Sequence, residues 1–234
     1  MSGRQHVGPS CRWLGGPEWR SLSVHQITSI LTATKRRGRT CASTLWIRLT
    51  SVTWPVRPAS SSILEPRGCP ADEIDRVTIP RLQSCVDELR AAGNPITLRP
   101  EINGKAAMLG SLSGVLEMAK AIPCSVPCID FIHLHARLGD GAITTYDEWI
   151  SALEFYRKLL GNGVMHILHI HLSGINYGPK GEKNHLIMEE SDLDFRNFMR
   201  ALHSMGVKGR IMCESPVLEV DALKIKALWL EVSG

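Results

Sequence analysis

The chain has 234 residues, of which 44% are hydrophobic and 21% are charged. This is a globular composition, and the length suffices for one sizeable core or two small ones. The formal net charge is +4, and no run of about 18 consecutive apolar residues occurs, which excludes a membrane-spanning helix. Seven cysteines without a recognisable signal peptide predict a reducing compartment, so we expect a cytoplasmic protein.

The charge is unevenly distributed along the chain. Residues 1–64 hold nine Lys and Arg and one acid, a net charge of +8, which leaves 18 bases and 22 acids, or −4, for residues 65–234. Up to about residue 70 no helical or strand period is sustained. Three interpretations stay open there: an organellar leader, a basic arm for nucleic acid, or a stretch that is not a selected sequence. We favour the last, because the globular pattern begins abruptly, and divide the chain into a poorly patterned basic segment, 1–70, and a patterned part, 71–234.

Strands and helices alternate regularly from about residue 79 onward. Thr145 and Glu148 form a predicted capping box at one helix start, Gly161 ends that helix, and Ser191 is the predicted cap of the next helix. In chain order we expect a helix over 79–89, a strand over 95–100, a helix over 109–122, a strand over 126–132, a helix over 146–160, a strand over 164–172, a helix over 192–205, a strand over 209–213 and a helix over 221–230. This α/β pattern predicts a parallel sheet, either doubly wound or a (β/α)8 TIM-type barrel.

The four strands share a chemical feature at their C-terminal ends. Each delivers a metal-competent side chain there: Glu101, Asp130, His171 and Glu214. In a barrel these ends converge on one mouth. Two Glu, one Asp and one His form an oxygen-rich set that suits Zn²⁺ or Mn²⁺. No glycine-rich dinucleotide turn follows any of these strands, so we expect no nicotinamide or ATP site.

A second set of metal-competent residues follows just beyond two of these strands. His133, Glu182 and His185 offer a carboxylate and two imidazoles, which is enough to hold another ion beside the first. Clustered divalent ions suit the hydrolysis of a phosphodiester, because one lowers the pKa of a water and the others neutralise the phosphoryl oxygens and the leaving group. Two metal groups therefore favour a phosphodiesterase over a single-ion enzyme.

Several short motifs in register resemble the endonuclease IV family, in the form seen in its archaeal-type members. The likeness runs from about residue 75 to the C-terminus. The matching pieces are Leu-Arg-Pro-Glu at 98–101, Asp-Phe-Ile-His at 130–133, His-Ile-His-Leu-Ser-Gly at 169–174, Gly-Glu-Lys-Asn-His at 181–185 and Cys-Glu-Ser-Pro at 213–216.

The resemblance implies a (β/α)8 barrel with up to three zinc ions that cuts DNA 5′ to abasic sites. It assigns Glu101 to a carboxylate that bridges two zinc ions, with Asp130, His171 and Glu214 in the rest of one shell. His133, with His185 and Glu182, resembles the shell of the third zinc, although three positions separate Glu182 from His185 where the family has a closer spacing. His25 resembles one histidine of the first zinc, and the second histidine has no counterpart. The catalytic residues implied are Glu101 and Glu214.

The same resemblance places DNA-contacting residues around the mouth. Arg99, Lys105 and Arg137 are expected to meet phosphate oxygens, and the expected partner is DNA with abasic sites, bound by a monomer away from membranes. Residues 79–234 supply the second half of a barrel, while too few residues precede them for four further units. We therefore expect a barrel that is incomplete or irregular in its N-terminal part.

Two other functions stay open at the level of the sequence. One is a sugar isomerase or epimerase of the xylose-isomerase-like barrels, which use a similar shell of Glu, Asp, His and Glu around one or two ions. The other is a degenerate barrel that binds metal or DNA without turnover. The number of ions bound distinguishes these alternatives from the nuclease, for which the resemblance implies about three ions, with Zn²⁺ expected before Mn²⁺.

Overall fold

The computed structural model describes the C-terminal two-thirds of the chain nearly completely. The described residues are 20–23, 29–30, 48–49, 59–62, 78–91 apart from 81, 85, 88 and 89, and 97–234 apart from 109 and 124. His25 and most of the basic segment 1–70 therefore lie outside the described residues.

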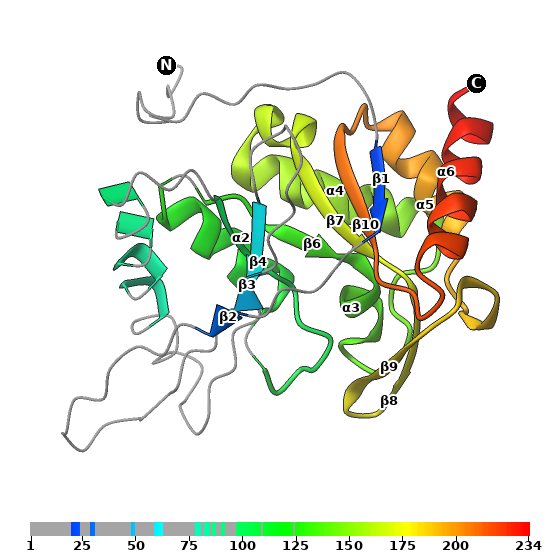
Figure 1. The fold of residues 1–234 in the computed structure, drawn as a ribbon, viewed down its shortest axis with the longest axis horizontal. Helices are drawn as coiled ribbons and strands as arrows, with labels where there is room; N and C mark the ends of the chain where they lie inside the picture. Colours follow the sequence, from blue (N-terminus) through cyan, green and yellow to red (C-terminus); the bar gives the residue numbers. More distant parts are fainter. Residues whose placement is uncertain are drawn as a thin grey trace.

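A parallel sheet forms the centre of the described structure (Figure 1). Strand β6 (Cys128–Asp130) pairs with β7 (Leu168–Leu172), and β7 pairs with β10 (Gly209–Cys213). Strand β10 in turn pairs with β1 (Arg20–Ser23), so the last strand of the chain lies beside the first. This parallel pairing of first and last strands is what the closure of a barrel requires.

The remaining strands extend this arrangement on the other side of β6. Strand β4 (Ala59–Ser62) pairs with β5 (Thr97–Pro100) in parallel, and an isolated bridge between Glu101 and Cys128 joins the end of β5 to β6. Two further pairs are antiparallel. They are β2 (Ser29–Ile30) with β3 (Arg48–Leu49), and β8 (Gly174–Gly178) with β9 (Gly181–Leu186).

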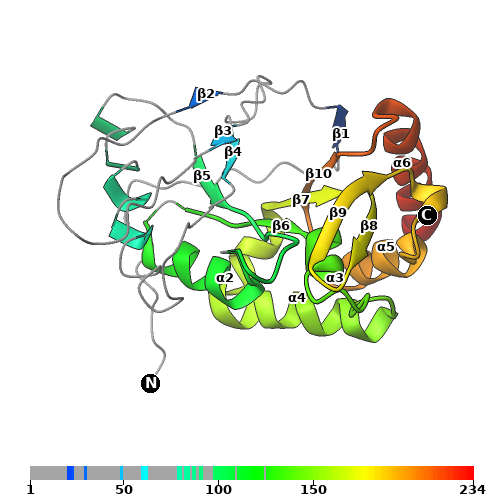
Figure 2. The same ribbon diagram turned by 90° about the horizontal axis from the view of Figure 1, so that it is seen from below.

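Helices pack along the outer side of the parallel sheet, as the alternation in the sequence predicts. They are α2 (Leu112–Ala121), α3 (Phe131–Ala136), α4 (Tyr146–Leu160), α5 (Phe195–Ser204) and α6 (Glu219–Ser233), with short 3₁₀ turns at Asn162–His166 and Met188–Glu190. Figure 2 shows α2 and α4 beneath the strands β6 and β7. Helical turns also occur at 78–80, 82–84, 86–87 and 90–91. No helix within the described ranges combines the length and the apolar content needed to cross a bilayer.

The structure differs from the predicted boundaries of several elements: α2 and α6 differ by up to three residues at an end, and β6, β7 and α5 differ for local reasons. Strand β6 ends at Asp130, because the Asp130 carboxylate accepts a hydrogen bond from the His133 amide and starts α3. Strand β7 begins only at Leu168, since residues 162–166 form a 3₁₀ turn. Helix α5 is capped by Asp194 rather than Ser191, through a 2.9 Å hydrogen bond from the Asn197 amide. The capping box of Thr145 is confirmed.

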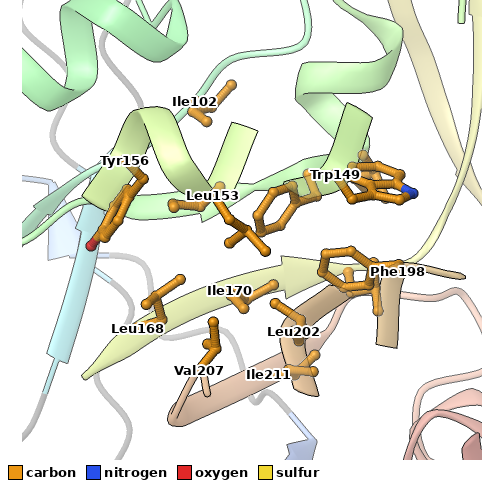
Figure 3. Packing of buried hydrophobic residues seen from close by; sticks show 14 of the residues in the cluster. Ile102, Trp149, Leu153, Tyr156, Leu168, Ile170, Phe198, Leu202, Val207 and Ile211 are labelled. Atoms are coloured by element: carbon orange, nitrogen blue, oxygen red, sulfur yellow. The ribbon is translucent and has the colours of Figure 1, made fainter. Parts of the chain in front are cut away.

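The two faces of β7 separate the core from the site. Leu168 and Ile170 point toward α4 and α5 and pack against the buried Leu153 and Phe198 (Figure 3). Because side chains alternate along a strand, His169 and His171 point to the opposite face, the interior of the barrel. The apolar layer under the helices thus orients the histidines inward.

The aromatic cluster between α4 and α5 predicts a large stability effect. Phe198 is 1% exposed, and its ring lies 4.8 Å from that of Phe131 and 5.1 Å from that of Trp149. Phe198→Ala should lower the free energy of unfolding by about 3–5 kcal/mol in urea titrations, because a cavity replaces the ring. The matched change Phe155→Ala, at an exposed position on the same helix pair, should cost about 1 kcal/mol or less. Equal losses in both variants would contradict this packing.

Candidate metal centre

Four side chains from neighbouring strand ends meet in the barrel interior. Glu101 follows β5, Asp130 ends β6, His171 lies in β7 and Glu214 follows β10. Their ligand atoms all lie within 4.8 Å of one another. The structure therefore brings together the four residues that the strand ends predicted, and we call them the carboxylate group.

His171 is the centre of the carboxylate group. Its Nδ1 lies 2.7 Å from Glu101 Oε1 and 3.4 Å from Glu214 Oε1. The distance from the same nitrogen to Asp130 Oδ2 is 3.9 Å. Glu101, Asp130 and His171 are buried, whereas the Glu214 side chain is 27% exposed. The group is therefore accessible from the side of Glu214.

A second set of ligands, which we call the hairpin group, lies beside the first. It consists of His133 from α3 with Glu182 and His185 from β9, and their ligand atoms lie within 4.8 Å of one another. His133 Nε2 is 3.4 Å from Glu182 Oε2, and the rings of His133 and His185 are 5.7 Å apart. His185 Nδ1 contacts the backbone carbonyl of Glu214 at 3.0 Å, which ties the hairpin group to the carboxylate group.

A β-bulge explains why the unusual spacing of Glu182 and His185 still forms a group. In a regular strand, residues three apart face opposite sides. Asn176 pairs with Asn184 and Tyr177 pairs with Glu182, so Lys183 is the extra residue of an irregularity in the ladder. The extra residue restores a common face for Glu182 and His185. The sequence analysis predicted no strand between residues 172 and 192. Gly178, Pro179 and Gly181 are turn residues, and they could have indicated the hairpin.

The donor atoms of the hairpin group fit a metal ion. His133 Nδ1 lies 3.0 Å from the carbonyl oxygen of Ile102, which can only accept, so in the neutral ring Nδ1 carries the proton. Nε2 then has a free lone pair. It is buried and has no hydrogen-bond partner among the described residues. A buried imidazole nitrogen aimed at a carboxylate and a second histidine is the donor set that Zn²⁺ prefers.

The charges in the site shift several pKa values. Burial lowers the pKa of His133, but the carboxylates of Asp130 and Glu182 outweigh burial, and the net pKa lies well above its usual value. Burial also lowers the pKa of His171, yet Cys128, Glu101 and Glu214 raise it well above normal. Burial raises the pKa of Glu214. The two histidines therefore hold protons that a bound cation would replace.

The loop after β5 supports the hairpin at very close range. The amide of Glu182 donates to the carbonyl of Gly104 at 2.9 Å. A Cβ at Gly104 would lie 2.6 Å from Glu182 Cβ and 3.0 Å from His133 Cδ2. Only glycine fits at 104, because any side chain would push Glu182 and His133 apart.

Arg137 supports this loop rather than reaching the mouth. Its guanidinium donates to the backbone carbonyls of Asn103 at 2.6 Å, Met108 at 2.8 Å and Lys105 at 3.0 Å. The expected contact of Arg137 with phosphate does not agree with this geometry. A guanidinium engaged by several carbonyls fixes the loop that carries Gly104.

The other residues expected to bind DNA differ in exposure. Arg99 is 5% exposed, and burial lowers its pKa to about 10. It lies in β5, two residues before Glu101, and its burial does not agree with the expected contact with phosphate oxygens. Lys105 is exposed on the loop and stays a predicted phosphate contact. His25, the expected ligand of a further zinc, lies outside the described residues.

The tight approach at Gly104 predicts a selective loss of metal. Gly104→Ala should displace Glu182 and weaken ion binding at the hairpin group by about tenfold or more, while the carboxylate group keeps its ion. Zn²⁺ titrations that resolve the two affinities would measure this. Gly163→Ala is the control, because a Cβ there meets nothing within 4 Å. Unchanged binding in Gly104→Ala would refute the role of the close contact.

The raised histidine pKa values predict that metal binding releases protons. Zn²⁺ affinity should rise with pH, because the cation competes with protons on His133 and His171. Calorimetric titrations in buffers of different ionisation enthalpy give the number of protons released. His171→Gln should lower that number, whereas His166→Gln, at an exposed position, should leave it unchanged. Binding without proton release would show that both rings are neutral in the metal-free chain.

Comparisons with known proteins agree with this architecture. An uncharacterized protein of Methanocaldococcus jannaschii is 36% identical over 151 residues, which are 64% of this chain and 55% of that protein. The chain thus spans about half the length of this relative.

Solved structures with similar folds include two enzyme classes. A D-tagatose 3-epimerase-like protein has a TM-score of 0.52 at 20% identity, over 75% of this chain and 62% of that one. An IolI protein with a bound zinc atom has a TM-score of 0.51 at 14% identity, over 75% and 62%. Endonuclease IV from Thermus thermophilus has a TM-score of 0.51 at 16% identity, over 74% and 61%. At these identities the likeness shows the fold alone.

A family model described as "Xylose isomerase-like TIM barrel" matches residues 5–231, nearly the whole chain. The match agrees with the pairing of β1 with β10 and with the metal-competent side chains at the strand ends. The chain belongs to the xylose isomerase-like TIM barrel family.

Proposed function

We propose that the chain is a metal-dependent hydrolase that cuts the phosphodiester backbone of DNA 5′ to abasic sites, with zinc as its metal. The observation that supports this proposal is the hairpin group, held beside the carboxylate group by the contact between His185 and the Glu214 carbonyl. A sugar isomerase or epimerase needs only the ligands of the carboxylate group. A second set of ligands at contact distance suits a phosphodiester, whose oxygens need more than one cation.

The carboxylate group and the hairpin group would each hold one ion. Glu101, Asp130 and His171 are buried and would fix one ion rigidly, and Glu214, at the exposed edge, faces the substrate side. His133, Glu182 and His185 would hold a neighbouring ion. Bound zinc supplies a water of lowered pKa and neutralises charge on the phosphoryl oxygens.

Basic side chains near the mouth are available for the DNA backbone. Lys105 on the loop after β5 is exposed, as are Lys180 and Lys183 on the hairpin that carries Glu182. Such contacts position a nucleic acid without reading its sequence. Residues 65–234 carry a net negative charge, and these lysines supply positive charge close to the site.

A cleavage assay on a duplex with one abasic site tests the proposal. The zinc-loaded chain should cut 5′ to the site, chelators should stop the reaction, and Glu101→Gln should lower the rate by more than about a hundredfold, since even outer contacts to metal ligands cost 10–100-fold. Glu117→Gln, on the exposed face of α2, is the matched control and should cut normally.

Two outcomes would overturn the proposal in different ways. A chain that binds metal, leaves the duplex intact and interconverts ketose sugars would be an epimerase. A chain that binds metal and acts on neither substrate would be a binding protein. In the first case His185→Asn would leave the sugar interconversion unchanged, because the hairpin group would have no catalytic task.

A further inference from the structure

A third set of metal-competent side chains lies one layer deeper in the barrel than the carboxylate group. Cys128 and His169 are direct neighbours on β6 and β7. Each lies two residues before a member of the carboxylate group, Asp130 or His171, and points to the same face. The neighbours of the Cys128 thiol in the barrel interior are therefore imidazoles.

The distances in this set are those of a ligand cluster. Sγ of Cys128 and one ring nitrogen each of His169 and His171 lie within 4.8 Å of one another, and all three residues are buried. Cys128 is a free thiol. His169 Nδ1 is fully buried and has no hydrogen-bond partner among the described residues. An unpartnered buried nitrogen beside a free thiol is a pair of donor atoms available to a cation.

The imidazole ring of His171 belongs to both layers. Its Nδ1 lies 2.7 Å from Glu101 Oε1 in the carboxylate group. One nitrogen of the same ring also lies within 4.8 Å of the Cys128 sulfur. One ring therefore borders both an oxygen-rich set and a sulfur-containing set.

We propose that Cys128, His169 and His171 form a deeper subsite, which shares His171 with the carboxylate group, for a thiophilic divalent cation such as Zn²⁺, Co²⁺ or Cd²⁺. Thiolate and imidazole ligands select such ions, whereas the carboxylate group suits harder ones such as Mn²⁺. Binding forms one sulfur–metal bond and two nitrogen–metal bonds, and the thiol proton and the proton that His171 holds in the metal-free chain leave to solvent without any change of oxidation state. The inference does not depend on cleavage at abasic sites.

The surrounding charges decide how this subsite binds. Arg99 and Arg210 both act on His169 and oppose a nearby cation. A neutral thiol would not offset them, but the thiolate formed on binding adds a negative charge at the sulfur. The subsite therefore requires Cys128 itself, and a serine there should not replace it.

Cobalt titration of the metal-free full chain tests the subsite. The wild-type chain should develop a thiolate-to-cobalt charge-transfer band in the near ultraviolet, and Cys128→Ser should lose that band. Cys213→Ser is the control, because Cys213 is also a buried free thiol and donates only to the Leu218 carbonyl. His169→Gln should weaken the cobalt affinity reported by the band by about tenfold or more.

Manganese binding separates loss of the subsite from loss of the fold. Cys128→Ser should still bind Mn²⁺ at the carboxylate group, as measured by electron paramagnetic resonance. If Cys128→Ser fails to fold, the cobalt affinity of His169→Gln, measured through the charge-transfer band, tests the subsite instead. A band that persists in Cys128→Ser, an unchanged affinity in His169→Gln, or no band in the wild type would overturn the proposal.

Discussion

The carboxylate of Asp130 is the contact on which the site depends. It is completely buried, and a buried carboxylate is stable only with hydrogen bonds or cations around it. Oδ1 accepts from the amide of His133 at 2.9 Å and starts α3, while Oδ2 lies 2.9 Å from His133 Nδ1 and 3.9 Å from His171 Nδ1. One side chain thus ends a strand, begins a helix and places a ligand of each metal group.

The loop after β5 and the β8–β9 hairpin distinguish this site from one that needs only the carboxylate group. The loop carries Gly104, whose carbonyl accepts from the Glu182 amide, and Arg137 fixes the loop through several carbonyls. On the other side, His185 contacts the backbone of Glu214. Both groups are therefore held by one connected set of contacts, so that a shift in the hairpin would alter the distance between ions bound at the two groups. The proposed hydrolysis of a phosphodiester would depend on that distance.

The sequence predicts the parallel sheet and the convergence of Glu101, Asp130, His171 and Glu214, because parallel strands bring their carboxyl ends to one edge. It does not predict the bulge at Lys183, since the irregularity depends on pairing with a strand that the sequence did not reveal. The burial of Arg99 and the carbonyl contacts of Arg137 were also missed. Both depend on which residues surround a side chain in three dimensions, and an arginine near a metal motif looks the same in a sequence whether it is exposed or enclosed.

We expect each of the two adjacent groups of metal-competent side chains to bind an ion. Anomalous diffraction from crystals of the zinc-loaded chain, measured on both sides of the zinc edge, tests it most directly. The account predicts one zinc peak among Glu101, Asp130, His171 and Glu214, and a second among His133, Glu182 and His185. A peak at the carboxylate group with none at the hairpin group, under saturating zinc, would contradict the account and leave a single-ion site.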